Sequence, residues 1–369
     1  MNYLNSNSIK MSLEISRDES DRISVFKLWL SIMIVFIHSY DSNVNFAEET
    51  ISFDVPFWID TLMYIIQVLS MSAVPAFFFL SSYLLYRKPF TWKHNIQKKA
   101  RSLLIPYFIF NSFWVAVYFV AQHIPALSSF FSQPGNIVAN WSVGEWFSHF
   151  FGSPSSIYPV LYPLWFIRDL FILNLVSPVF AWIEERIHSF SLVLYISIWI
   201  LLDSSHIFFL DLKGICFWGI ACYFAKNRIS ISKMDRYKTM LVFIYPLMVI
   251  AVCFLRGITG IGNQILLRCC LLFGVAFWYV CTTRITITNV KKRILFVSKY
   301  SFCIFLFHEM SLRILRKISI KLIPQSSFSV MTLYFVIPII IVLYCIMLSW
   351  LLDKYTPKLY KIINGGRSR

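Results

Sequence analysis

The feature that most constrains this chain is a series of long, nearly uncharged apolar stretches, which recur from residue 23 to residue 352. A helix that crosses a bilayer needs about 20 mostly apolar residues, because lipid offers no partner to backbone polar groups. The chain is 58% hydrophobic and 14% charged, whereas soluble domains carry about 25% charged residues. The sequence therefore excludes a soluble enzyme and a disordered or fibrous protein, and it predicts an integral membrane protein.

Ten of these stretches predict an all-α polytopic fold with about ten transmembrane helices. They cover residues 23–40, 60–86, 102–123, 160–183, 190–203, 206–225, 239–256, 264–282, 293–311 and 328–352. The fifth stretch is short enough to be a tilted or incomplete span. We expect residues 23–352 to form a single transmembrane domain between a polar tail (1–22) and a basic tail (353–369). The first tail lacks the apolar core of a signal peptide, so the first helix is expected to be an uncleaved anchor.

The basic residues between the stretches predict the orientation of the chain. Of 34 Lys and Arg, 24 fall in the two tails and the even-numbered connections, and five fall in the odd-numbered connections. Cytoplasmic connections are enriched in basic residues, so both tails are expected in the cytoplasm of a multi-pass cell (inner) membrane protein. Because the cations form short clusters, the net charge of +16 indicates topology and no nucleic-acid partner. The connection 312–327 departs from the rule, since it holds Arg313, Arg316, Lys317 and Lys321.

Two connections expected on the outer side are distinctive. The connection 41–59 contains no cation and four acidic residues, Asp41, Glu48, Glu49 and Asp54. The connection 124–159 contains no Lys or Arg and is rich in aromatic residues. Aromatic residues are ordinary at a membrane surface, but this longer loop is also suited to closing over a site.

The cysteines give no sign of a metal site or a disulfide framework. All eight lie in apolar segments or at their ends, and no C-x-x-C pair occurs. The sequence also lacks the G-x-S-x-G, phosphate-loop and H-E-x-x-H motifs. We therefore expect no metal.

Ionisable residues inside the predicted spans are the candidate functional residues, because charge at membrane depth is costly. At 1.5 Å per residue, His38 lies about 22 Å from the start of the first span, and His308 and Glu309 reach a similar depth. Arg168 and Asp169 lie about 12 Å from the outer end of the fourth span. Asp211 and Lys213 enter the same layer. This convergence predicts a polar cavity open to the outer side.

Structural alternatives exist for several of these residues. Arg168 and Asp169 would be a structural pair if they neutralise each other or partners on adjacent helices. Lys213 and Arg268 fit structural or interfacial positions, and Lys299 can extend to the headgroups. His38 and His308 could serve as packing donors, but two His at one depth suit proton transfer near neutral pH.

Lys27 and His38 share one helix face. Their separation of eleven residues is three turns plus about 20°, and about 17 Å along the axis. A cation at the cytoplasmic end and a candidate base near the outer end suit an elongated ligand with an anionic head.

Five sequence blocks follow one another along the chain. They are Arg22–Ser39, Val74–Leu85, Lys98–Tyr107, Tyr162–Pro178 and Ser298–Glu309. Together, and in this order, they resemble the membrane acyltransferase-3 family, which includes polysaccharide O-acetyltransferases. The first block is similar to the family's opening helix, in which a basic residue precedes a His by eleven positions. Lys27 and Lys99 stand where the family usually has Arg.

The resemblance implies transfer of an acyl group across the membrane. The donor would be acetyl-CoA or another acyl-CoA, bound from the cytoplasm with Lys27, Lys99 and Arg101 near its phosphates. His38 would act as general base or carry the acyl group, and Arg168 or another donor at that depth would stabilise the oxyanion. Asp169 and His308 complete the candidate catalytic residues, with a positioning role expected for His308. The acceptor would be a hydroxyl of a surface or lipid-linked glycan.

Two other classes remain compatible with the sequence. A secondary transporter or glycan exporter would also place His and charges in a proton-coupled pathway. The second alternative is a non-catalytic partner protein related to the family. Binding of acyl-CoA by the purified protein would distinguish an acyltransferase from both alternatives.

Overall fold

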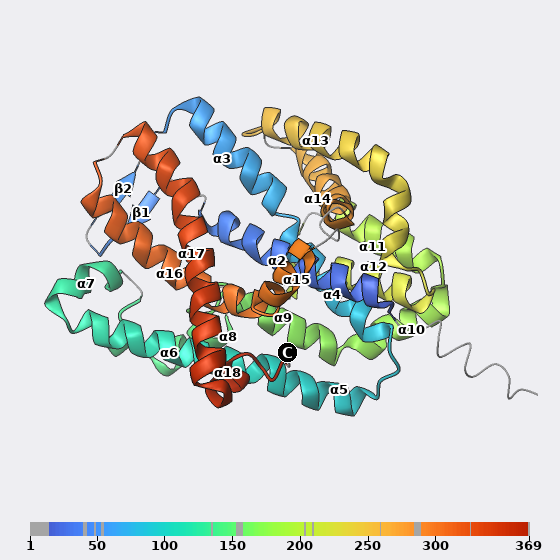
Figure 1. Cartoon of the computed structure of the whole chain (residues 1–369), viewed down its shortest axis with the longest axis horizontal. Helices are drawn as coiled ribbons and strands as arrows, with labels where there is room; N and C mark the ends of the chain where they lie inside the picture. The colour runs from blue at the N-terminus through green and yellow to red at the C-terminus, as the bar shows by residue number, and fades with distance from the viewer. Residues whose placement is uncertain are drawn as a thin grey trace, which may run out of the picture. The chain divides into compact units, whose positions relative to one another are not determined.

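The computed structural model shows an almost entirely helical chain (Figure 1). It describes residues 15–39, 43–47, 49–52, 55–133, 136–152, 158–202, 204–208, 210–258, 260–283, 289–324 and 326–367. Asp41, Glu48 and Asp54 lie outside these residues. The all-α prediction is confirmed.

The helices follow one another in the order of the predicted spans. They are α2 (Arg17–Ser39), α3 (Phe57–Ser70), α4 (Ala73–Tyr86), α5 (Trp92–Lys99), α6 (Ile105–Gln122), α7 (Pro125–Phe131), α8 (Val143–Phe151), α9 (Leu164–Leu175), α10 (Ser177–Ile187), α11 (Phe190–Leu201), α12 (Leu212–Lys226), α13 (Lys238–Phe254), α14 (Ile261–Cys281), α15 (Asn289–Ser298), α16 (Ser301–Leu322), α17 (Ser327–Tyr355) and α18 (Pro357–Ile363). A π-helix, η1 (Ala100–Leu104), precedes α6, and two 3₁₀ helices are η2 (Val138–Asn140) and η3 (Ile231–Tyr237).

Two small antiparallel hairpins complete the described elements. Strand β1 (Asn43–Asn45) pairs with β2 (Thr50–Ser52), with Val44 opposite Ile51. Strand β3 (His206–Ile207) pairs with β4 (Leu210–Asp211).

Among the described residues, six helices or helix pairs are long and apolar enough to cross a membrane. The number rises to eight when the interrupted pairs α9–α10 and α15–α16 each count as one span. Each of the ten predicted stretches contains helix, but α11 and α12 have only 12 and 15 residues. Both are shorter than the roughly 20 residues of a full span.

Three predicted boundaries are wrong. The sixth stretch, 206–225, begins in the hairpin of β3 and β4, and its helix α12 begins at Leu212. Helix α2 begins at Arg17, six residues before the expected start, so part of the predicted polar tail is helical. Helix α16 continues to Leu322, although residues 312–327 were expected to be a connection. Its pattern of apolar residues persists beyond residue 311, and the chain meets no Pro before Pro324.

The chain divides into two compact units. The first contains residues 1–30, 68–99 and 169–299, and the second contains residues 31–67, 100–168 and 300–369. Helices α2, α3 and α9 contribute to both units.

In the first unit, α4 packs along α12, and α13 packs along α14. Gly219 on α12 permits close approach to α11, because a Cβ atom there would lie 2.5 Å from the Tyr195 ring. Arg268 on α14 donates from Nη1 to the carbonyl oxygens of Trp199 and Leu202, at 3.1 and 2.5 Å. It thereby satisfies acceptors that the end of α11 leaves open, which agrees with the structural position expected for Arg268.

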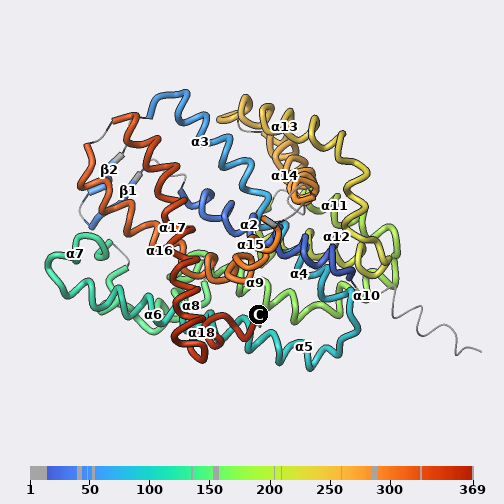
Figure 2. Tube along the Cα trace, in the orientation of Figure 1, coloured from blue at the N-terminus to red at the C-terminus, as the bar shows by residue number. Residues whose placement is uncertain are grey.

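In the second unit, α16 and α17 run side by side (Figure 2). Ile59 and Met63 of α3 pack with Val330 and Tyr334 of α17 in a buried cluster. The Tyr334 hydroxyl donates to the Met63 carbonyl at 3.1 Å. These contacts hold α3 and α17 together beside the C-terminal end of α2, whose Phe36 packs on the same cluster.

The close approach of α11 and α12 gives the first prediction. Gly219→Ala should destabilise the protein by about 1–3 kcal/mol, because the added methyl group overpacks the buried Tyr195 ring. Thermal unfolding in detergent measures the change. Gly144→Ala is the matched control, since a Cβ atom at Gly144 would have no neighbour within 4 Å. Equal unfolding midpoints for both variants would show that the α11–α12 contact is loose.

Candidate active site

The second unit brings three titratable side chains together: His38 from α2, and His308 and Glu309 from α16. The ring centroids of His38 and His308 are 5.2 Å apart. His38 Nδ1 lies 3.3 Å from Glu309 Oε2. The separate helices therefore converge, as the common depth of these residues predicts.

Glu309 is held between two basic groups. Its Oε1 accepts a hydrogen bond of 2.6 Å from Nε of Arg313, one turn further along α16. Its Oε2 faces the His38 ring. Glu309 is 4% exposed, so these neighbours supply the compensation that a buried charge requires. Arg313, Glu309 and His38 are thus neighbouring polar groups, named here the relay, in which Oε2 of Glu309 lies 3.3 Å from His38 Nδ1 but makes no hydrogen bond among the described residues.

The relay favours one tautomer of His38. A proton on Nδ1, the ring nitrogen that faces the carboxylate at 3.3 Å, would leave Nε2 with a basic lone pair. The opposite arrangement would direct a lone pair at a negative charge. His38 also packs edge-to-face on Tyr162, with centroids 5.5 Å apart. Its ring is therefore oriented by two neighbours.

His308 is fixed by its own helix. Its Nδ1 lies 3.0 Å from the Ile304 carbonyl oxygen and 2.8 Å from that of Phe305. Nδ1 therefore carries the proton. Its Nε2 is buried and has no hydrogen-bond partner among the described residues. Nδ1 of His308 thus serves in packing, as a donor to its own helix, whereas Nε2 can accept a hydrogen bond or a proton.

A cavity of about 530 Å³ adjoins this cluster. Its walls are apolar side chains interspersed with charged, phenolic and amide groups, of which the polar ones are His38, Asn45, Gln67, Tyr118, Gln133, Tyr162, Glu309, Arg313, Arg316 and Lys317. Such a mixture of apolar surface and a few converging polar groups is typical of small-molecule sites. His38 and Glu309 place the relay on the cavity wall.

Part of the aromatic connection 124–159 lines this cavity. Leu127, Phe130 and Phe131 of α7 contribute to its wall together with Gln133. The Lys317 ammonium of α16 donates to the Phe130 carbonyl oxygen. Closure of the site by this connection stays a prediction.

Arg168 and Asp169 each make a hydrogen bond with a group outside the cavity wall. Arg168 Nη1 donates to the Phe151 carbonyl oxygen at 2.7 Å, at the end of α8. Asp169 accepts a 2.9 Å hydrogen bond from the backbone NH of Asp211. Neither residue is among the described residues that line the cavity. Their catalytic role stays a prediction, and the contacts shown are structural.

Asp211 and Lys213 form a helix cap. Asp211 accepts from the backbone NH of Lys213 at 2.7 Å, at the start of α12. The Lys213 ammonium lies 3.0 Å from the same carboxylate. Both residues belong to the first unit, with Asp169.

The three basic residues expected at the donor lie in different units. Lys27 is half-buried on α2 and Lys99 ends α5, both in the first unit. Arg101 is exposed on η1 in the second unit. Short π-helices are frequent at functional sites. The C-terminal segment packs on η1, because Arg367 donates to the Ser102 carbonyl oxygen at 3.0 Å.

Sequence reasoning missed the basic residues Arg313, Arg316 and Lys317 as site residues, because it assigned them to a connection. Two signals were available. Arg313 follows Glu309 by four residues, the spacing of an ion pair on a helix. Arg316 and Lys317 follow Arg313 by three and four residues, which places all three on one helix face.

The cluster also has the geometry of a possible metal site. One nitrogen of each His and one Glu309 oxygen all lie within 4.8 Å of one another. Two His and one carboxylate are common metal ligands. Against this use, Glu309 already has Arg313 as a partner at 2.6 Å. The absence of a metal stays a prediction.

Comparisons with known proteins agree with this geometry. The acyltransferase-3 family model, described as an acyltransferase domain, matches residues 21–352. The succinoglycan biosynthesis protein ExoH of Rhizobium meliloti (strain 1021) is 28% identical over 224 residues, which are 59% of this chain and 57% of that protein. The match thus spans less than two thirds of that relative's length. No solved structure matches the chain.

The family match includes His38, the whole of α16 and all residues that line the cavity. It covers most of the chain, including the apolar helices long enough to cross a membrane. The chain therefore belongs to the acyltransferase-3 family of multi-pass membrane acyltransferases.

Proposed function

We propose that this protein transfers an acetyl group from cytoplasmic acetyl-CoA to a hydroxyl of a surface or lipid-linked glycan on the outer side of the inner membrane. The observation that carries the proposal is the relay of Arg313, Glu309 and His38 on the wall of a large cavity. The similarity to a succinoglycan biosynthesis protein supports a glycan as the acceptor.

His38 is the proposed general base. Its Nε2 takes the proton of the acceptor hydroxyl while the hydroxyl oxygen attacks the thioester carbonyl carbon. The carbon–sulfur bond then breaks, and His38 returns the proton to the departing thiolate. Glu309 stabilises the imidazolium between these steps, as the carboxylate of a catalytic triad does. A transient acyl group on His38 is the variant of this mechanism in which the same nitrogen is the nucleophile.

The remaining predicted residues have supporting roles in this proposal. Arg168 would donate to the oxyanion, with Asp169 fixing the adjacent turn of α9. His308 would position the His38 ring, whose centroid lies 5.2 Å from its own. We propose that no metal takes part, because Arg313 already compensates Glu309.

Lys27, Lys99 and Arg101 are the proposed phosphate contacts of the donor. Phosphates bind cations through charge-assisted hydrogen bonds. Lys27 lies about 17 Å from His38 along α2, which suits a thioester at His38 and phosphates at the far end. Membership of an acyltransferase family favours an enzyme over the transporter and exporter alternative.

Replacement of His38 tests the mechanism. His38→Ala should bind acetyl-CoA normally but acylate the glycan about 10²–10⁴-fold more slowly, the usual loss for a general base. Glycan mass spectrometry of cells that carry each variant measures the acetyl content. His123→Ala, at an exposed His, is the matched control. Near-normal acetylation by a His38→Ala protein of normal abundance would contradict the mechanism.

The same assay tests the role of metal. Acetyl transfer by the wild-type protein in isolated membranes should survive treatment with a chelator. Loss of activity that returns with added metal would assign His38, His308 and Glu309 to a metal site instead.

The donor assignment predicts the effect of three substitutions on affinity. Lys27→Gln, Lys99→Gln and Arg101→Gln should each raise the Kd for acetyl-CoA about tenfold, a loss of about 1.4 kcal/mol. Titration of the detergent-purified proteins measures the change. Lys233→Gln, at an exposed Lys of η3, should leave the Kd unchanged. Wild-type affinity in all three variants would place the phosphates elsewhere.

The orientation is tested by thiol labelling of intact cells. A membrane-impermeant reagent should label Gly144→Cys in α8 and not Thr91→Cys, because the connection 124–159 carries no basic residue and the connection 86–101 carries six. Both positions are exposed, and the wild-type protein gives the background from native thiols. The reverse labelling pattern would invert the topology and the direction of transfer.

A further inference from the structure

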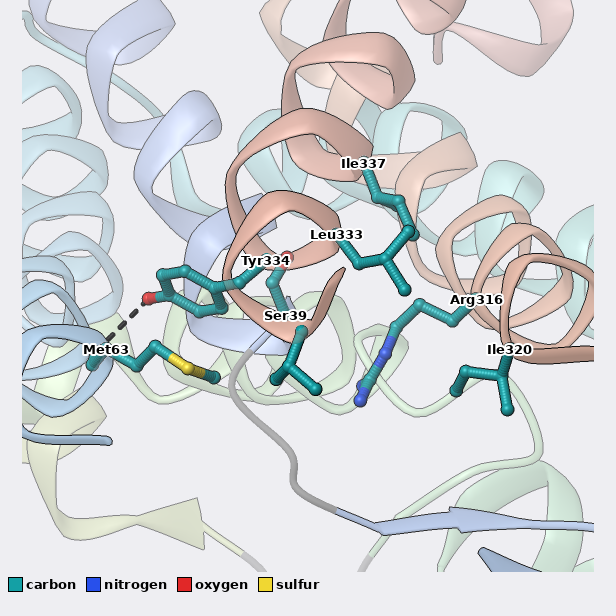
Figure 3. A pocket seen from close by; sticks show the side chains of 8 residues that line it. Ser39, Met63, Arg316, Ile320, Leu333, Tyr334 and Ile337 are labelled. Atoms are coloured by element: carbon teal, nitrogen blue, oxygen red, sulfur yellow. Dashed lines mark hydrogen bonds between the residues drawn. The ribbon is translucent and has the colours of Figure 1, made fainter. Parts of the chain in front are cut away.

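Helix α17 leads to the segment that contacts η1. Its first half is fixed in the second unit, where the Tyr334 hydroxyl lines a void of about 30 Å³ and donates to the Met63 carbonyl oxygen of α3 (Figure 3). Helix α18 follows and begins with Pro357, a residue that suits the first turn of a helix. Tyr360 and Ile363 of α18 are both 7% exposed. The short helix α18 is therefore packed against the rest of the second unit.

A buried thiol of α16 contacts the end of α18. The Sγ atom of Cys303 lies 3.7 Å from the Tyr360 hydroxyl oxygen and 3.8 Å from Oδ1 of Asn364. Asn364 is 2% exposed, and its Nδ2 donates to the Arg367 carbonyl oxygen at 3.2 Å. These contacts fix the place of the turn that follows α18.

Residues 364–367 form this turn, and its backbone favours glycine. The backbone NH of Gly366 donates to the Lys361 carbonyl oxygen at 2.7 Å, and that of Gly365 donates to the Ile362 carbonyl oxygen at 3.0 Å. This pair of bonds is the Schellman motif, which ends a helix in the left-handed region. The φ angles of Gly365 and Gly366 are 65° and 67°, where any other L-residue is strained.

The turn lies directly on the backbone of η1. A Cβ atom at Gly365 would lie 2.2 Å from the Ser102 carbonyl oxygen and 2.6 Å from Nη1 of Arg367. Nη1 of Arg367 donates to this Ser102 oxygen at 3.0 Å and to the Asn364 carbonyl oxygen at 2.9 Å. The guanidinium carbon lies 3.5 Å from the ring centroid of Phe302 on α16, which is a cation–π contact. We name the contacts of Gly365 and Arg367 with Ser102 the latch.

The latch acts on the turn that contains Arg101. Arg101 immediately precedes Ser102 in η1 and is exposed. The direction of its side chain follows the backbone of this π-helical turn. Such turns are rare and occur often at functional sites. A bond from Arg367 to the backbone beside Arg101 therefore restricts the positions that the Arg101 guanidinium can reach.

We propose that Arg367 is a positioning residue of the donor site, which holds η1 so that Arg101 meets the phosphates of the acyl-CoA. Gly365 permits the close approach that this bond requires. The inference rests on the proposed function, because that function assigns Arg101 to the donor phosphates. The alternative is that the charge of Arg367 merely attracts an anionic donor from a distance.

Hydrogen exchange of the donor-free protein in nanodiscs tests the latch itself. Arg367→Gln and Gly365→Ala should each speed amide exchange in residues 100–105 about fivefold, because η1 then opens more readily. Gly366→Ala is the matched control. It places a side chain at the same positive φ, but its Cβ atom would have no neighbour within 4 Å. Wild-type exchange of residues 100–105 in both latch variants would overturn the proposal.

Titration of the same proteins with acetyl-CoA tests the positioning role. Arg367→Gln and Gly365→Ala should each raise the Kd about fivefold, the loss expected for one hydrogen bond. Gly366→Ala should leave the Kd unchanged. Lys361→Gln, at an exposed Lys of α18, removes the same charge from the same segment and should also leave it unchanged. Equal increases in Kd for Lys361→Gln and Arg367→Gln would indicate attraction by charge and would overturn positioning.

A double substitution tests whether Arg367 acts through Arg101. In the Arg101→Gln protein, the further change Arg367→Gln should raise the Kd less than about twofold, because the residue that it positions is absent. The same fivefold increase with and without Arg101 would show that Arg367 acts independently, and it would overturn the proposal.

The two measurements distinguish failure of the latch from failure of the proposed function. If Arg101→Gln raises the Kd but Arg367→Gln does not, the positioning role is overturned and the donor assignment stands. If Arg101→Gln binds acetyl-CoA with wild-type affinity, the donor assignment of Arg101 is overturned, and the positioning role with it. The exchange rates of residues 100–105 still show in that case whether Arg367 holds η1.

Discussion

A carboxylate buried at membrane depth must be compensated, and the contacts of Glu309 follow from that requirement. Arg313 binds one oxygen at 2.6 Å and His38 lies 3.3 Å from the other. Removal of either neighbour would leave charge in a medium that stabilises it poorly. The position of α16 against the end of α2 is therefore coupled to the orientation of the His38 ring, and both are coupled to the shape of the cavity.

Much of this arrangement could be predicted from sequence. Apolar length predicted a helix within each of the ten stretches, although the sixth stretch begins in the β3–β4 hairpin. Axial depth grouped His38 with His308 and Glu309. The extent of α16 could not be predicted in this way, because four cations within nine residues resemble a polar connection. The helix tolerates them because their side chains face a cavity or lie beside aromatic rings, as Lys321 lies 4.6 Å from the Phe46 centroid.

Arg168 and Asp169 show a second limit of depth arguments. Neighbouring residues on a helix differ by about 100° in direction, so equal depth does not place them at the same site. Arg168 binds the end of α8, whereas Asp169 binds the backbone at the start of α12. Which of these two side chains lies nearer the reacting groups depends on how the helices pack against one another. The sequence around Arg168 and Asp169 does not determine that packing.

The short helix α11 has a consequence for the surrounding lipid. Twelve residues of α-helix are about 18 Å long, whereas the hydrocarbon layer of a bilayer is about 30 Å thick. Arg268 supplies the hydrogen bonds that would otherwise require the helix to continue. A helix of this length would cross the layer only where the lipid beside it thins or water reaches its end, and such a mismatch would favour membranes or lipid compositions that deform easily.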